Sequence, residues 1–145
     1  MNAEIRIART RLQAAVLLGI VVLSRPGCSN LDGESGVLTK GTWGGEHMLL
    51  EIDEALTRVE FDCAHGTIDL PILLAEGQFN VTGTFTQEHG GPIREGEQVT
   101  PIAARYFGRV HGDIMTVTVN LPDEKRNVGT FELLRGNAGR VFKCL

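Results

Sequence analysis

Three histidines in this 145-residue chain have neighbours that could help them to bind a metal ion or an organic ligand. They lie in the segments Glu46-His47, Ala64-His65-Gly66 and Glu88-His89-Gly90. Imidazole nitrogens and carboxylate oxygens are ligands that zinc and copper accept, at about 2.0–2.2 Å for zinc. Because no two of the histidines have the short spacing of a local metal motif, the fold would have to assemble the site. The candidate metal ligands are His47, His65, His89, Glu46 and Glu88.

The same histidines have two other interpretations. They are either turn residues whose rings bond the backbone or a carboxylate, or groups that contact an organic ligand. Extending the strand alternation places His65 on the face of Phe61, and His89 on the face of Phe85. Since a glycine that frees the backbone follows each of the two, we expect both to line one end of the fold, together with His47.

Nucleophilic catalysis has little support in the sequence. It needs a serine or cysteine beside a base, and a third group that orients the base. The chain has no serine after Ser35, and its cysteines are better explained by a disulfide. No glycine-rich phosphate loop precedes a helix. The sequence therefore favours a binding protein over an enzyme.

Residues 1–28 have the organisation of an export signal. Three arginines precede the apolar run of residues 12–24, which is shorter than the roughly 20 residues of a membrane-spanning helix. Gly27-Cys28 then resembles the end of a bacterial lipoprotein signal, in which the cysteine is lipidated. Cleavage near Ser24 or after Ser29 is the alternative. Either route predicts an exported protein that is periplasmic, anchored to the outer membrane or secreted, with a lipid on Cys28 as its one expected membrane contact.

The cysteine count is consistent with export. Removal or lipidation of Cys28 leaves Cys63 and Cys144, an even pair in an oxidising compartment. In the expected strands Cys63 shares a face with Phe61, and Cys144 shares one with Phe142. We therefore predict a disulfide between Cys63 and Cys144, with two buried free thiols as the alternative.

The charge distribution argues against a nucleic-acid partner. Four of the 14 Lys and Arg residues and one of the 18 Asp and Glu residues lie within residues 1–28, so residues 29–145 hold ten basic and seventeen acidic residues. A domain this acidic repels a phosphate backbone.

Residues 41–145 alternate apolar and polar side chains with period two, which is typical of half-buried strands. Seven or eight such runs follow one another, joined mostly by short turns. Residues 71–76 are at best one turn of helix, and a last strand is expected at 141–145. The pattern predicts an all-β, antiparallel up-and-down meander that closes into a small barrel. The expected organisation is a signal at 1–28, a tether at 29–40 and a barrel domain at 41–145.

One face of these runs is expected to form a single core. The predicted members are Phe61, Val81, Phe85, Val117, Val119, Phe131 and Leu133. Trp43, on the first expected strand, either fills this core or offers a platform to a ligand.

Gly41-Thr42-Trp43 resembles the Gly-x-Trp signature that opens lipocalins, and avidins begin in a similar way. Both are calycins, closed antiparallel barrels that hold a small ligand. The sequence patterns of segments 77–85, 108–119 and 129–136 also resemble those of a lipocalin or avidin meander. The resemblance implies that an arginine, Arg135 or Arg140, packs against Trp43. Biotin is not the ligand it implies, because the further tryptophans of an avidin pocket are missing. The chain also resembles small exported barrel domains of bacteria.

These observations predict three alternative functions. The first is an extracytoplasmic carrier or sensor of a small, partly apolar ligand, with Trp43, His47, Phe61, His65, Phe85 and His89 as its candidate contacts. The second is a structural or interaction module with a filled core that meets a partner at the cell surface. The third is a metal-binding protein or metal-dependent enzyme that uses His47, His65 and His89. An interior cavity above about 300 Å³ would favour the carrier, and a packed core the interaction module.

Overall fold

The computed structural model describes residues 35–91 and 99–144, so the predicted signal at 1–28 and Cys28 lie outside the described residues. No helix within these ranges is long and apolar enough to cross a membrane. The strands are β1 (Gly36–Val37), β2 (Gly41–Gly44), β3 (Met48–Ile52), β4 (Thr57–Phe61), β5 (Ala64–Ile68), β6 (Leu73–Leu74), β7 (Gln78–Gln87), β8 (Ile102–His111), β9 (Ile114–Leu121) and β10 (Arg126–Arg135).

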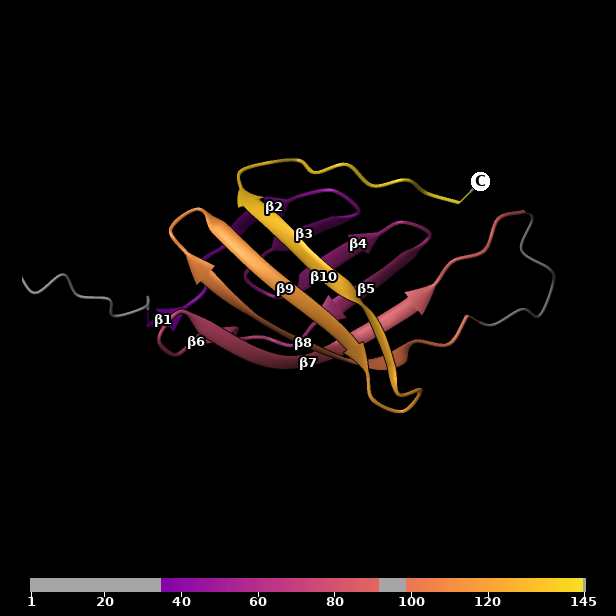
Figure 1. The fold of residues 1–145 in the computed structure, drawn as a ribbon, viewed down its shortest axis with the longest axis horizontal. Helices are drawn as coiled ribbons and strands as arrows, with labels where there is room; N and C mark the ends of the chain where they lie inside the picture. Colours follow the sequence, from indigo (N-terminus) through magenta and orange to yellow (C-terminus); the bar gives the residue numbers. More distant parts are fainter. Residues whose placement is uncertain (1–34, 92–98, 145) are drawn as a thin grey trace, which may run out of the picture.

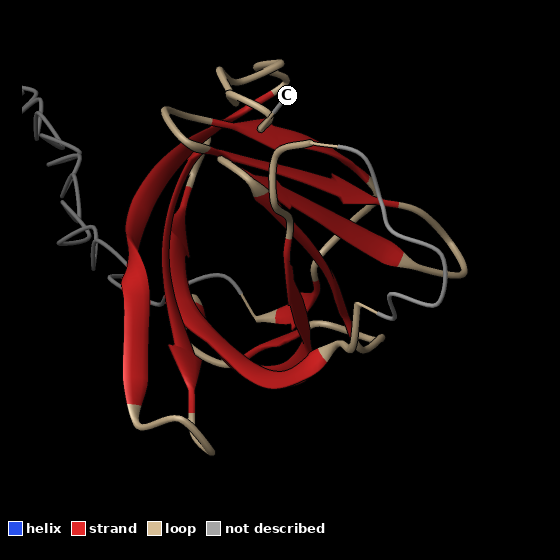
Figure 2. Cartoon of the chain, turned by 90° about the vertical axis from the view of Figure 1, so that its right-hand side faces the viewer, coloured by secondary structure: helices blue, strands red, loops and turns tan. Residues whose placement is uncertain are grey.

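Eight of these strands form a closed antiparallel barrel (Figures 1 and 2). Each pairs with the next along the ring in the order β2-β3-β4-β5-β7-β8-β9-β10, and β10 pairs with β2 to close it. The strands differ in length, since β2 to β5 have four or five residues whereas β7 and β10 have ten. The predicted all-β meander barrel is therefore confirmed.

The barrel interior is filled by apolar side chains. Of the seven predicted core residues, five are buried, and Val81 and Phe131 are partly buried against the core. Trp43 is 1% exposed and Tyr106 is fully buried. The Tyr106 hydroxyl donates to the Thr84 carbonyl oxygen at 2.6 Å, which satisfies its one donor inside the core. Burial raises the pKa of Tyr106, so this hydroxyl stays protonated.

A short ribbon of β1 and β6 lies at one end of the barrel, on the left in Figure 1. Leu38, which follows β1, is buried and donates its N–H to the Ile72 carbonyl oxygen at 2.9 Å. The folded part of the chain therefore includes residues that the sequence analysis placed in the tether at 29–40. Residues 71–76, expected to form at most one turn of helix, contain β6 instead. We call this end of the barrel the closed end.

Four connections meet at the opposite end, which we call the mouth end and which faces the viewer in Figure 2. They are the β2–β3 turn (45–47), the β4–β5 turn (62–63), the described parts of the β7–β8 connection (88–91 and 99–101) and the β9–β10 turn (122–125). In an up-and-down barrel alternate connections fall at the same end, so segments distant in sequence come together here.

The chain after β10 runs back along the outside of the barrel, and we call residues 136–144 the C-terminal strap (Figure 1). It turns over Gly44, where an added Cβ would lie 2.3 Å from the Gly139 nitrogen, so only glycine fits. The predicted Cys63–Cys144 disulfide is confirmed, with the two Cα atoms 4.9 Å apart. The last strand predicted at 141–145 is wrong for the described residues 141–144, because the strap crosses the turns instead of extending along a barrel strand.

Candidate functional site at the mouth of the barrel

A pocket of about 240 Å³ lies across the mouth end, and we call it the mouth pocket. Its walls come from the β2–β3 turn, the end of β4, the end of β7 and the start of β10, which lie on different sides of the ring. It is therefore formed only when the barrel is closed. Its lining residues are His47, Phe61, Asp62, Phe85, Gln87, Arg126, Asn127, Val128 and Phe131.

Three phenyl rings form the floor of the mouth pocket. The ring centre of Phe61 lies 5.4 Å from that of Phe85 and 5.7 Å from that of Phe131, and both pairs are tilted. Tilted pairs at these distances are favourable for aromatic rings. Phe61 and Phe85 are buried members of the core, whereas Phe131 is half-buried and packs against the core.

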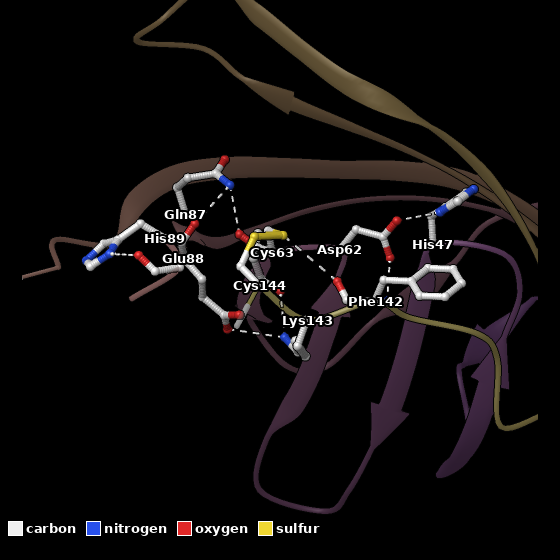
Figure 3. Close-up of a disulfide and its surroundings, with 11 residues drawn as sticks. His47, Asp62, Cys63, Gln87, Glu88, His89, Phe142, Lys143 and Cys144 are labelled. Atoms are coloured by element: carbon white, nitrogen blue, oxygen red, sulfur yellow. Dashed lines mark hydrogen bonds and ion pairs between the residues drawn. A yellow bond between two sulfur atoms is a disulfide. The ribbon is translucent and has the colours of Figure 1, made fainter. Parts of the chain in front are cut away.

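His47 and Asp62 form a hydrogen-bonded pair on the rim (Figure 3). The His47 Nδ1 lies 2.5 Å from one carboxylate oxygen of Asp62, and the other oxygen accepts the Phe142 N–H of the strap at 2.8 Å. The Phe142 N–H lowers the pKa of Asp62, burial opposes this effect, and His47 adds to the lowering. Both carboxylate oxygens are thus engaged within the protein.

Arg126 and Gln87 complete the polar part of the rim. The Arg126 Nε donates to Glu124 at 2.9 Å, and its guanidinium carbon lies 5.6 Å from the ring centre of Phe85. This places a positive charge over the aromatic floor. The Gln87 side-chain amide donates to the Cys63 carbonyl oxygen at 2.7 Å, which fixes its orientation beside the disulfide (Figure 3).

A second imidazole–carboxylate pair lies outside the mouth pocket. The His65 Nδ1 is 2.7 Å from Glu88, and Lys143 of the strap binds Glu88 at 3.2 Å and also pairs with Glu60. Burial raises the pKa of Glu88, but His65 and Lys143 together outweigh it and the net shift is downward. Burial also lowers the pKa of Lys143, and the two glutamates more than reverse that effect.

The strand face predicted for His65 is wrong. β4 ends at Phe61, and the tight turn at Asp62 and Cys63 starts a new strand, so the alternation of β4 does not continue to residue 65. On β5 it is Ala64, Gly66 and Ile68 that point into the barrel, and His65 is exposed on the outside. Cys63 has a positive φ of 51°, which reverses the chain within this turn.

The predicted metal ligands are not gathered into one cluster. His89 bonds the Gly90 carbonyl oxygen at 3.3 Å, and Glu46 pairs with Arg140 at 3.4 Å. Among residues 35–91 and 99–144, no group of three or more His, Cys, Asp and Glu side chains is arranged to hold a metal ion. The imidazoles of His47 and His65 are each paired with a different carboxylate.

The mouth pocket thus contains three of the six predicted ligand contacts, namely His47, Phe61 and Phe85. Trp43 is in the core, and His65 and His89 belong to the mouth end without lining the pocket. Sequence reasoning missed Asp62, Gln87 and Arg126, and assigned Phe131 to the core alone. A signal for Arg126 was present in the sequence. It is the last of four consecutive charged residues, 123–126, and it comes shortly before Phe131.

A larger depression of about 620 Å³ lies on the outer surface over β7, β8 and β9. Phe107, which is 36% exposed, and Arg109 contribute to it, together with the two threonines Thr116 and Thr118. None of the predicted site residues lies there.

In comparisons with known proteins, no protein-family model matches this chain, and no curated protein or solved structure matches it significantly. By its structure, the described part of the chain belongs to the class of closed, eight-stranded antiparallel barrels, with a small pocket at the mouth.

Proposed function

We propose that this protein is an extracytoplasmic carrier or sensor that binds a small, partly apolar molecule in the mouth pocket. The observation that carries the proposal is the pocket itself, in which three phenyl rings lie beneath a rim of hydrogen-bonding side chains. A concave apolar surface with a few placed polar groups is the usual form of a small-molecule site. Export, with or without a lipid on Cys28, is part of the same proposal.

The calycin-like architecture supports this function. Calycins are closed antiparallel barrels that hold small ligands, and this chain forms such a barrel with eight strands. The Arg135 guanidinium carbon lies 4.8 Å from the ring centre of Trp43, so Arg135 has the place that the lipocalin resemblance implies for an arginine. Arg140 instead packs over Phe142 in the strap.

The volume of the pocket limits the ligand. At about 240 Å³ it is smaller than the pockets of about 300–1,000 Å³ that hold drug-sized molecules. The interior beneath it is filled, because Met48, Leu50 and Val59 are buried with Trp43 and Tyr106. The ligand is therefore no larger than a single ring with one or two substituents, and it binds at the mouth instead of deep inside the barrel.

A titration with small aromatic compounds followed by amide NMR tests this function. We expect the amides of residues 61, 85, 87 and 126–131 to shift, and those over the outer depression to stay unchanged. Val128 is half-buried and lines the pocket, so the variant Val128→Phe should fill part of it and abolish binding. Val37→Phe makes the same change at an exposed position on the β1–β6 ribbon and should leave binding intact. Native mass spectrometry of protein purified from its own host would identify the natural ligand.

A surface interaction module is the second candidate, and the filled interior favours it. If no small compound perturbs the mouth pocket, the barrel serves as a rigid scaffold that presents its outer surface to a partner. In that case, substitutions over the outer depression, such as Phe107→Ser, would weaken capture of that partner and Val128→Phe would not.

A further inference from the structure

We infer that the mouth pocket selects small organic anions: a flat apolar body rests on the phenyl floor, and its carboxylate faces Arg126. This inference rests on the proposed function, because it names the chemical class of the ligand for the same pocket. It depends on which charges around the pocket are already compensated within the protein and which are still able to bind a ligand.

The aromatic floor alone would suit either an uncharged or a cationic ligand. Phe61 and Phe85, which are 3% and 2% exposed, and the half-buried Phe131 line the pocket and make its bottom apolar. The faces of phenyl rings also attract cations. The rim must therefore determine the charge of the ligand.

Asp62 is the one carboxylate that lines the pocket, and it is committed elsewhere. His47 and the Phe142 N–H occupy its two oxygens at 2.5 Å and 2.8 Å. A cationic ligand would compete with these two donors for the charge of Asp62, and displacing the Phe142 N–H would remove one of the hydrogen bonds that hold the strap to the rim. Asp62 therefore offers little to a ligand cation.

Arg126 is the group that remains able to bind a ligand ion. Its Nε forms an ion pair with Glu124, which partly balances its charge, but its two terminal amino groups make no hydrogen bond to residues of the described ranges and can donate to a ligand. Its guanidinium stands over the Phe85 ring, so a ligand cation would meet a like charge at the same place. A carboxylate would accept paired hydrogen bonds from the guanidinium while the ligand body covers the floor.

The test compares three probes that share one ring and differ in charge: benzoate, benzyl alcohol and benzylammonium. Each is titrated into the full-length protein at neutral pH and low salt, and binding is read from the amide shifts of the pocket residues. We expect benzoate to bind about tenfold more tightly than benzyl alcohol, and benzylammonium to bind most weakly. Added salt should reduce the preference for benzoate.

Two arginine variants give the matched control. Arg126→Gln should bring the affinity for benzoate to within about twofold of that for benzyl alcohol. Arg58→Gln removes an arginine that is likewise paired with a carboxylate, Asp53 at 3.2 Å, but that lies at the closed end, and it should leave the preference unchanged. Both arginines are about half exposed, so neither change should prevent folding.

The outcomes separate this inference from the proposed function. If benzyl alcohol or benzylammonium binds the pocket as tightly as benzoate does, or if Arg126→Gln keeps the preference for benzoate, the inference is wrong while ligand binding at the mouth stands. If none of the three probes shifts the pocket amides at millimolar concentration, the proposed function fails and the inference fails with it.

Discussion

Breaking the Cys63–Cys144 disulfide should destabilise the folded protein mainly through its effect on the unfolded chain. The bond joins residues 81 positions apart, and it is reached from the solvent side because both cysteines are at least partly exposed. The double variant Cys63→Ala/Cys144→Ala removes it without leaving a free thiol in the barrel domain. Reduction of the unaltered protein removes the same link without any substitution.

The size of the effect follows from the length of the loop that the bond closes. For a separation of 81 residues, the chain-entropy relation gives a loss of unfolded-state entropy of about 15 cal/mol/K, or about 4.5 kcal/mol near room temperature. Urea unfolding of a domain of this size has a slope of about 1–3 kcal/mol per M. The midpoint should therefore fall by about 1.5–4.5 M when the disulfide is absent.

Urea denaturation with and without reductant measures this shift, and intact mass before and after reduction shows whether the bond was present. The substituted protein is the control, because reductant should leave its midpoint unchanged. If the bond is present by mass and the oxidised and reduced midpoints still coincide within about 0.5 M, the chain-entropy reasoning is refuted. If reduction adds no two hydrogens, the disulfide itself is absent.

Three further outcomes are expected. Phe61→Ala should lower the free energy of unfolding by about 3–5 kcal/mol, because it opens a cavity between the core and the mouth pocket. A urea midpoint that moves no more than that of a surface threonine variant would contradict this. The folded-state pKa values of Asp62 and Glu88 are lowered, so their contribution to stability is complete above their ordinary values of 3.8 and 4.5 and is lost as pH falls through the folded-state values. Midpoints measured from neutral into acidic pH should show this loss, and Asp62→Asn should remove part of it; an identical profile in the variant would exclude Asp62 as a source. Arg135→Met should lower the free energy of unfolding by about 0.5–2 kcal/mol and change the fluorescence of Trp43, the single tryptophan. An unaltered fluorescence spectrum would mean that the two side chains do not interact in solution.

The fold was largely predictable because its signal is local. Period-two alternation identifies which side chains of a strand share a face, and short turns between strands imply that neighbours in sequence pair in space. The core residues Val117 and Val119 on β9 and Leu133 on β10 were found in this way. The β1–β6 ribbon was not found, because a strand of two residues has no period to detect.

The mouth pocket was only partly predictable, since its geometry depends on how the barrel closes. Phe61 and Phe85 follow from strand alternation, but their position beside Arg126 depends on the pairing of β10 with both β9 and β2. His65 shows the limit of alternation, because a turn of two residues at Asp62 and Cys63 begins a new strand whose face has to be assigned afresh. The strap was missed because its hydrogen bonds go to turns and side chains, for which no sequence period exists.

The closure of the ring by β10 and β2 also determines when the protein can fold. A chain that leaves a ribosome or an export pore with its N-terminus first presents β2 to β5 long before β10 has emerged. Until then the sheet has two open edges, which are able to pair with other chains. The contacts between residues most distant in sequence are the slowest to form. Cys63 likewise cannot form its disulfide before Cys144 is available. Barrel closure and formation of this disulfide therefore wait until β10 and Cys144 are available, and until then the incomplete sheet is prone to aggregate.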